Sequence, residues 1–261
     1  MTVTAELARR FASVIGLLIL LAVWTLFGVF GLGTHGAVPT PWAVIHQMIE
    51  DGAGLYWSNA VVTITYAAQG FLWGNLAALA VATLTLLVPR LAPAASQLAV
   101  ISYCTPLTAV GPIVLVVMGG RAPTIFLSAM AVFFTTLVGA LLGVRSADPA
   151  ALDVIRAYGG NRWQQLVKVQ LVAAAPAVVN ALKIAAPSAM LGAILGEYLG
   201  GVDSGLGVVL TLAQQQFDVA RTWALALVIG LLAFAGYGLF SLLGRVLTPW
   251  AAGRSELGGA R

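Results

Sequence analysis

Charged residues are scarce in this sequence. Of its 261 residues only 8% are charged and 60% are hydrophobic, whereas roughly 25% of residues are charged in an ordinary soluble domain. Asp, Glu, Lys and Arg are absent from five long stretches, 11–49, 52–89, 91–120, 122–144 and 222–244. Each stretch exceeds the ~20 apolar residues that span a bilayer. A soluble fold would carry charged outer faces, so the sequence predicts an all-α, polytopic membrane protein.

Cysteine and histidine are nearly absent as well. The single Cys104 excludes an internal disulfide, and His35 and His46 are too isolated to predict a metal site. No G-x-x-x-x-G-K-S/T phosphate loop is present, so we expect no ATP hydrolysis by the chain itself. Energy for transport would then come from a separate ATPase or from an ion gradient.

Catalytic and ion-coupling side chains are equally rare. A membrane enzyme acting on lipid or a prenyl carrier would need acid–base or metal-binding residues clustered at one depth, and the sequence has no such cluster. Glu197 is the only acidic residue inside an expected span. An ion-coupled secondary transporter or channel subunit, which would need such groups, is therefore the alternative reading. The modest net charge of +4 does not predict nucleic-acid binding.

The apolar stretches predict six transmembrane helices in one domain, 11–250. We expect the spans at about 11–32, 60–88, 94–118, 123–144, 177–199 and 223–247, with residues 1–10 and 251–261 as the two ends. Placing the N-terminus in the cytoplasm puts 11 of the 13 Lys and Arg residues inside, and leaves only Arg121 and Arg221 outside. By the positive-inside rule, both termini are expected in the cytoplasm.

Between the first two spans the sequence predicts a short amphipathic helix. Thr40 can cap a helix that begins at Pro41. Its apolar face would carry Trp42, Ile45, Met48 and Ile49. Such a helix lies at a membrane interface, and an interfacial anchor is favoured over a direct role in binding solute.

Glycines four residues apart recur within the expected spans. The pairs are Gly70 and Gly74, Gly139 and Gly143, Gly192 and Gly196, and Gly196 and Gly200. This spacing lets one helix approach the backbone of another. We interpret the pairs as packing sites.

A polar segment, 145–168, interrupts the chain after the fourth span. Asp148 can cap a helix begun by Pro149, Gly159 and Gly160 can end it, and Asn161 can cap a second short helix. One face of the first helix would carry Ala151, Val154, Ile155 and Tyr158, and another face Asp153 and Arg156. Such a pair of helices suits docking into a groove of another protein. An ordinary cytoplasmic loop with positive charge explains the pattern equally well.

The stretch ALDVIRAYGGNRWQQLVKVQLVAAAP, residues 151–176, resembles the cytoplasmic signature loop of ABC-importer permeases. In that family an acidic residue and two small residues precede a glycine, and a hydrophobic-Leu-Pro element follows. The matching residues here are Asp153, Gly159, Val169 and Leu171. Val154, Ile155 and Val172 depart from the pattern, although Val154 and Ile155 can still face the permease body. Two interpretations remain open: atypical coupling, or a heteromeric pair whose other permease has the fuller motif.

The likeness extends over about residues 39–250. Arg156 and Pro176 fit the subgroup that resembles alkanesulfonate, nitrate and taurine permeases. Further matching elements are Pro39-Thr40-Pro41, the paired Pro106 and Pro112, Glu197 followed by Ser204-Gly205-Leu206-Gly207, and Trp250 near the end. Their order and spacing identify the chain as similar to the type I, binding-protein-dependent permeases.

The resemblance implies a set of partners. Two permease copies or paralogues would meet in the bacterial inner membrane, with two cytoplasmic ATPase subunits that use ATP and Mg and an extracytoplasmic substrate-binding protein. This chain would bind no cofactor. The residues implied in ATPase coupling are Asp153, Val154, Ile155, Arg156, Tyr158, Gly159, Gly160 and Arg162. The first helix would act as a rigid lever in the ATPase cleft.

Individual roles follow within that segment. A side chain at Gly159 is expected to clash with the turn out of the helix. Arg156 and Arg162 would pair either with acidic groups of the ATPase or with lipid headgroups.

Few residues of the sequence indicate where the solute pathway runs. Polar residues that could line it are Gln69, Asn75, Ser102, Tyr103, Thr105, Thr108 and Ser188, although helical Ser and Thr also bond to backbone carbonyls. Glu197 lies ~30 Å along its span and is expected to pair with or cap the turn at 204–207 rather than to contact solute. No cationic cluster lies within the spans. A small organic solute is expected, and a neutral or weakly charged aromatic or heterocyclic compound remains open besides a sulfonate.

Overall fold

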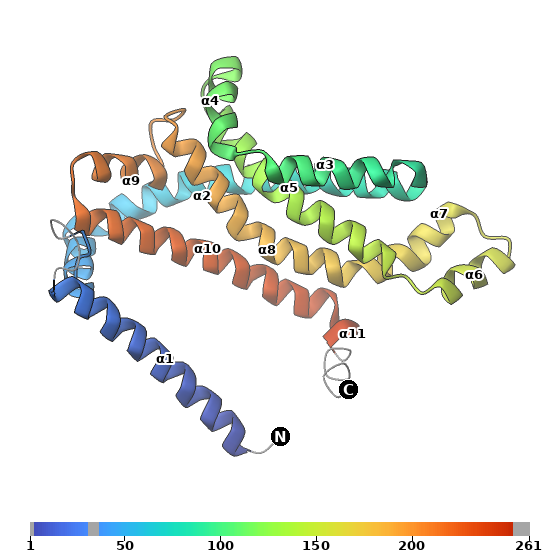
Figure 1. Ribbon diagram of the computed structural model, residues 1–261, viewed down its shortest axis with the longest axis horizontal. Helices are drawn as coiled ribbons and strands as arrows, with labels where there is room; N and C mark the ends of the chain where they lie inside the picture. The colour runs from blue at the N-terminus through green and yellow to red at the C-terminus, as the bar shows by residue number, and fades with distance from the viewer. Residues whose placement is uncertain (1–2, 31–36, 253–261) are drawn as a thin grey trace. The chain divides into compact units, whose positions relative to one another are not determined.

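The computed structural model describes residues 3–30 and 37–252, with the side chains of residues 12, 14–30 and 37–250. His35, Arg254 and Arg261 lie outside the described residues, as do the side chains of Arg9 and Arg10. The described chain is helical throughout and contains no strand (Figure 1). This confirms the prediction of an all-α fold.

The helices follow one another with short connections. In chain order they are α1 (Val3–Val29), α2 (Pro41–Leu87), the 3-10 turn η1 (Pro89–Leu91), α3 (Ala92–Cys104), α4 (Leu107–Met118), α5 (Ala122–Arg145), α6 (Pro149–Ala157), α7 (Arg162–Gln165), the π-helical turn η2 (Leu166–Gln170), α8 (Leu171–Tyr198), α9 (Leu206–Gln215), α10 (Val219–Leu247) and α11 (Pro249–Ala252).

Four of the described helical runs are long and apolar enough to cross a membrane. They are Pro41–Leu87, Ala122–Arg145, Arg162–Tyr198 and Val219–Leu247. A fifth is present if α3 and α4 together form one broken span. In α1, the part with described side chains, Val14–Val29, is shorter than a full span. The structure thus provides four or five membrane helices, and the six spans with both termini inside stay predictions.

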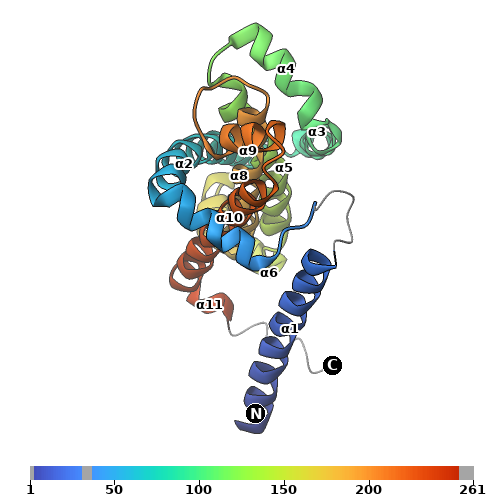
Figure 2. The ribbon, with the colours of Figure 1, turned by 90° about the vertical axis from the view of Figure 1, so that its left-hand side faces the viewer.

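The contacts divide the chain into two compact units, which are described separately. The first comprises residues 1–58 and 209–228, and the second comprises 59–208 and 229–261. Figure 2 shows the same helices from a second direction.

In the first unit, two tryptophans hold the chain that leads into α2. The indole rings of Trp24 and Trp223 stack with their centroids 5.7 Å apart. The Trp24 ring N–H donates to the carbonyl of Pro39 at 3.0 Å, and the Trp223 ring N–H donates to the carbonyl of Ala37 at 3.2 Å. The Pro39-Thr40-Pro41 motif is thereby fixed next to both rings.

The short helix predicted after this motif is present. The backbone N–H of Ala43 donates to Thr40 Oγ1 at 3.4 Å, as expected of the N-cap. The helix breaks at Gly52, whose φ of 73° and ψ of 152° are not helical. Trp42, Ile45 and Ile49 are exposed on it. The helix resumes directly after Gly52. The second part of α2 therefore begins about seven residues before residue 60, where the second transmembrane span was predicted to start.

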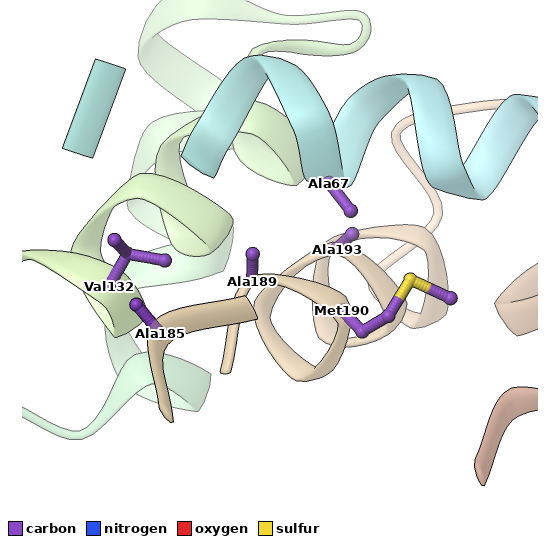
Figure 3. Packing of buried hydrophobic residues seen from close by; sticks show 6 residues of the cluster. All are labelled: Ala67, Val132, Ala185, Ala189, Met190 and Ala193. Atoms are coloured by element: carbon purple, nitrogen blue, oxygen red, sulfur yellow. The ribbon is translucent and has the colours of Figure 1, made fainter. Parts of the chain in front are cut away.

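In the second unit, α5 and α8 pack along their length (Figure 1). Small residues allow this contact: a Cβ added at Gly192 would lie only 2.5 Å from the Cα of Ser128. The Ser128 hydroxyl donates to the carbonyl of Ala189 at 2.9 Å. Beside it, Val132 of α5 and Ala67 of α2 pack with residues of α8, namely Ala185, Ala189, Met190 and Ala193 (Figure 3). The glycine pairs at 70/74, 139/143 and 192/196 face neighbouring helices, as predicted. The predicted pair 196/200 is wrong, because Gly200 lies beyond the end of α8 with a φ of 84° and a Cβ there would meet no atom within 4 Å.

The stretch predicted as one third span is two helices. α3 and α4 meet at an angle of 91°, and α4 turns away from α3 (Figure 1). Thr105 at the corner is extended, with ψ of 119°, because the ring of Pro106 disfavours helical geometry in the residue before it. Pro112, by contrast, is accommodated inside α4. The paired prolines therefore differ: only the first one breaks the helix.

We predict that Gly192→Ala destabilises the protein, whereas Gly230→Ala does not. At Gly192 the added methyl would meet the Ser128 backbone at 2.5 Å, whereas at Gly230 in α10 it would meet no atom within 4 Å. Overpacking costs about 1–3 kcal/mol, and an open helical Gly→Ala change gains up to about 1 kcal/mol. Thermal unfolding in detergent micelles measures both variants. Equal melting temperatures would contradict the packing described here.

Candidate functional site

The polar segment after α5 begins with a capped helix. Asp148 is extended, and its carboxylate accepts the backbone N–H of Ala150 at 2.9 Å. Pro149 occupies the first helical position, where a missing N–H removes no hydrogen bond. The start of α6 is therefore confirmed as predicted, and it is set by residues local in sequence.

Gly159 and Gly160 end α6, but their roles differ from the prediction. A Cβ at Gly159 would meet no atom within 4 Å; the requirement there is its φ of 75°, which favours glycine. The steric clash lies one residue later, because a Cβ at Gly160 would come within 2.7 Å of the Ile155 carbonyl oxygen. That carbonyl also accepts the Gly160 N–H at 2.8 Å. The turn thus favours glycine at both positions, at Gly159 because of the positive φ and at Gly160 because a side chain would collide with Ile155.

Asn161 caps the next helix through a reciprocal pair of hydrogen bonds. The Gln164 N–H donates to Asn161 Oδ1 at 2.9 Å, and the Asn161 N–H donates to Gln164 Oε1 at 3.0 Å. The helix that starts here is not a separate short one, contrary to the prediction. α7 runs through the π-helical turn η2 into α8, so that Arg162–Tyr198 is one apolar run. Pro176 lies inside α8 rather than at its start.

The surface of α6 presents large side chains to solvent. Tyr158 is 89% exposed and Val154 is 56% exposed. The expectation that Val154 can face the permease body is therefore wrong within this chain, whereas Ile155 is half-buried. The reason is the helix register, since Ile155 points toward the Gly160 turn and Val154 lies beside it on the open side.

The charges on α6 pair with each other. Arg156 donates to Asp153 at 2.8 Å, and both side chains are mostly exposed. An exposed pair of this kind contributes little stability. Either partner can therefore exchange this bond for one to another protein. Arg162 is also exposed.

At the other end of α8, Glu197 caps α9. Three successive backbone N–H groups begin that helix, and each donates to a side chain from elsewhere: Gly205 to Asn59 Oδ1 at 2.9 Å, Leu206 to Thr63 Oγ1 at 2.8 Å and Gly207 to Glu197 Oε2 at 2.7 Å. Glu197 is only 1% exposed. The predicted capping role of Glu197 is confirmed.

The glycines of this turn leave room for the carboxylate. Gly205 has a φ of 135°, and a Cβ there would lie 2.5 Å from Glu197 Oε1. The sequence analysis missed the two partners on α2, Asn59 and Thr63. Their spacing of four residues puts both on one helix face, which is the only signal that could have indicated them.

A second polar cluster lies in the first unit. Arg221 donates from Nε and Nη2 to the carboxylate of Asp51, at 2.5–3.1 Å, and the Asp51 side chain is only 2% exposed. Tyr56 and Gln47 also donate to it, at 2.8 and 2.9 Å. Asp51 ends the short helix before the Gly52 break.

One of the suggested pathway residues lies in different surroundings from those expected, and a second is exposed. Asn75 is buried; its Oδ1 accepts from Thr136 at 2.6 Å, and its Nδ2 donates to the Phe71 carbonyl at 2.7 Å. It joins α2 to α5 rather than lining a surface. The Tyr103 side chain is exposed, and its ring lies 4.5 Å from that of Phe134.

The remaining suggested residues are spread over several helices. Thr105 and Ser188 donate to carbonyls of their own helices, at 2.7 and 3.0 Å, as helical Ser and Thr commonly do. The Ser102 hydroxyl oxygen is buried. Gln69 is half-buried and Thr108 is exposed. These residues belong to α2, α3, α4 and α8 and the corner between α3 and α4, and their place along a pathway stays a prediction.

An apolar cavity of about 460 Å³ lies between α2, α8 and α10. Its lining includes Phe71, Met190 and Phe240, and small residues such as Ala67 and Gly236 form much of the rest. No group of three or more His, Cys, Asp or Glu side chains that could hold a metal occurs among the described residues.

We predict that Thr63→Val destabilises the protein by about 1–3 kcal/mol, because it leaves the buried Leu206 N–H without its acceptor. Thr65→Val is the matched control. Its hydroxyl is exposed and bonds only to Val61 of the same helix, so the change should stay within about 0.5 kcal/mol. Thermal unfolding and hydrogen exchange at the Leu206 amide report the effect. Unchanged exchange in Thr63→Val would refute the capping role.

Sequence relatives identify the kind of protein. Residues 70–252 match the family described as "Binding-protein-dependent transport system inner membrane component". A probable ABC transporter permease protein of Haemophilus influenzae is 30% identical, over 81% of this chain and 86% of its own. The riboflavin transport system permease protein RibX of Chloroflexus aurantiacus is 25% identical, over 82% and 81%. A putative aliphatic sulfonates transport permease protein, SsuC of Bacillus subtilis, is 27% identical, over 93% and 89%.

Solved structures of ABC transporters share the fold of this chain. A chain of the MetNI methionine ABC transporter in an inward-facing conformation superposes with a TM-score of 0.59 at 19% identity, covering 72% of this chain and 95% of that one. The capped segment before α8, the helical fold and the matched residues 70–252 lead to one conclusion: the chain belongs to the binding-protein-dependent transport system inner membrane component family and is a permease subunit of an ABC transporter.

Proposed function

We propose that this permease forms half of a pathway for a small organic solute, which a substrate-binding protein delivers and a separate ATPase drives through α6. The observation that carries the proposal is the exposed apolar surface of α6. Tyr158 and Val154 are large, exposed and set in a polar segment. Exposed apolar side chains in polar surroundings are typical of protein interfaces.

The backbone around α6 is suited to transmitting force. The turn at 159–160 is fixed by the hydrogen bond from the Gly160 N–H to Ile155 and by the reciprocal bonds of Asn161 and Gln164. Beyond it, the helical run Arg162–Tyr198 has no break. A movement of α6 driven by an ATPase would therefore be transmitted to α8. Asp153 and Arg156, paired only with each other, could re-pair with the ATPase surface.

The solute itself is inferred from the absence of charge and from the cavity. Among the described residues, the lining of the 460 Å³ cavity is apolar and aromatic. An anion would find no cationic group there. The relatives' names include riboflavin and aliphatic sulfonates. Of these classes, a neutral or weakly charged aromatic or heterocyclic solute fits the cavity better.

The remaining assembly follows from the same proposal. A second permease copy or a paralogue completes the pathway, and two ATPase subunits bind ATP and Mg. Both termini would lie in the cytoplasm, and the protein would reside in the bacterial inner membrane. Ion-coupled transport is the weaker alternative, since Glu197, the acidic residue that it would use, already caps α9.

We predict that Tyr158→Ala uncouples the transporter, whereas Tyr198→Ala does not. Tyr158 is the exposed residue that caps the C-terminus of α6, and Tyr198 is an exposed tyrosine at the C-terminal end of α8. The measurement is co-purification with the ATPase subunit and solute-dependent ATPase activity in proteoliposomes that also contain the substrate-binding protein. Loss of an aromatic contact at an interface should lower association about tenfold or more. Intact association and stimulated activity in Tyr158→Ala would show that α6 is not the docking element.

A further inference from the structure

Lys183 is a charged residue inside an apolar helix. It lies in the run Arg162–Tyr198, and its side chain is half-buried. Among the described residues, no ion pair or hydrogen bond to its ammonium group is present. The acidic residue of the same helix, Glu197, lies about 21 Å further along. An unpaired charge in a span is costly and usually marks a place where a partner binds.

The Lys183 side chain lies against the C-terminal part of α10. A Cβ built at the buried Gly244 would lie 2.9 Å from Lys183 Cε and 3.2 Å from its Nζ, so a glycine at 244 leaves room for the lysine. The Gly244 carbonyl is already occupied, because it accepts the N–H and the hydroxyl of Thr248 at 3.0 and 2.8 Å. A carbonyl with two donors has no lone pair left for the ammonium group. The counter-charge is therefore still missing.

This end of α10 lies at the level of the lipid headgroups. The charge-free stretch 222–244 is ~34 Å long as a helix, slightly more than the ~30 Å of hydrocarbon that it crosses. Arg245 follows directly and is exposed. Trp250, in the next short helix, is 54% exposed, and tryptophan is enriched at this depth. Because Lys183 lies beside Gly244, its ammonium group can reach the same layer.

Arg245 supplies a second cation at this level. It is the residue after Gly244, and within the described part of the chain it too lacks an ion-pair partner. Lys183, Gly244 and Arg245 all belong to the second unit. No cationic cluster was apparent in the sequence, because the two charges stand singly on different helices and only the fold brings them to one level.

Exposed apolar side chains surround Arg245 on α10. They are Leu242, Leu243, Val246 and Leu247, with exposed fractions of 40–76%. A ligand that satisfies both the charges and these side chains has an anionic head and a hydrocarbon tail. A free phosphate ion would gain nothing from the apolar surface. Basic sites between membrane helices at the interface are suited to acidic lipid headgroups.

We propose that Lys183 and Arg245 bind the phosphate of an anionic phospholipid where α8 meets the end of α10. The acyl chains would lie along the exposed apolar side chains next to Arg245. The bound lipid supplies the counter-charge that Lys183 lacks, and it would hold α8 and α10 together at this level. The site does not depend on which solute the permease carries.

The test titrates the complete transporter in detergent with phosphatidylglycerol or phosphatidylcholine and counts bound lipids by native mass spectrometry. The wild type should bind phosphatidylglycerol in preference. Lys183→Met and Arg245→Gln should each weaken that binding about fivefold, and the double variant about 25-fold. Lys183→Arg keeps the charge and should bind as the wild type does. Lys183→Met retains the stem beside Gly244, so its melting temperature without added lipid should match that of the wild type.

Arg90→Gln is the matched control, because Arg90 is an exposed arginine in η1 that the predicted topology places on the same membrane face. Its phosphatidylglycerol affinity should equal that of the wild type. An equal loss in Arg90→Gln would show diffuse attraction to the whole face and overturn the site, as would unchanged affinity in the double variant. Displacement of the lipid by soluble glycerol phosphate would assign the two cations to a free anion instead. Arg245→Gln, at an exposed position, decides the matter if Lys183→Met fails to assemble.

Discussion

The close contact between α5 and α8 is the constraint on which the second unit depends. At Gly192 and Gly196 the backbone of α8 touches that of α5, and no side chain fits between them. Within a membrane, helices gain little from the hydrophobic effect on association, so contact of this kind and hydrogen bonds such as that of Ser128 must hold them. Because α8 is fixed in this way, the segments at its two ends are positioned by it: η2 and α7 at the N-terminal end, and Glu197 at the C-terminal end.

The two ends of α8 have different roles. The N-terminal end continues without a break through η2 and α7 to the turn that positions α6. The C-terminal end carries Glu197, which caps α9 together with two residues of α2. A buried carboxyl group is costly in isolation, and at this helix start one of its oxygens, Oε2, accepts the Gly207 N–H while Oε1 is buried without a hydrogen-bond partner. One helix, α8, therefore joins a proposed ATPase contact to the cap of α9.

Local signals in the sequence were reliable wherever the interaction was local. The caps at Thr40, Asp148 and Asn161 involve residues two or three positions away, and the structure forms all three. The roles of the individual site residues were harder to predict. The sequence indicated that Gly159 and Gly160 end a helix, but it could not say that one provides a positive φ and the other avoids Ile155. Asn75 looked like a pathway residue because its partner, Thr136, lies on another helix.

The sequence by itself determined the environment, the helical class and the family resemblance, because charge-free stretches and short-range caps depend on composition and near neighbours alone. Only the tertiary structure decided the partners of Asn75, Glu197 and Asp51. These features depend on which helices touch. Asp51 and Arg221 are 170 residues apart, and no periodicity in a sequence records a contact between residues so far apart.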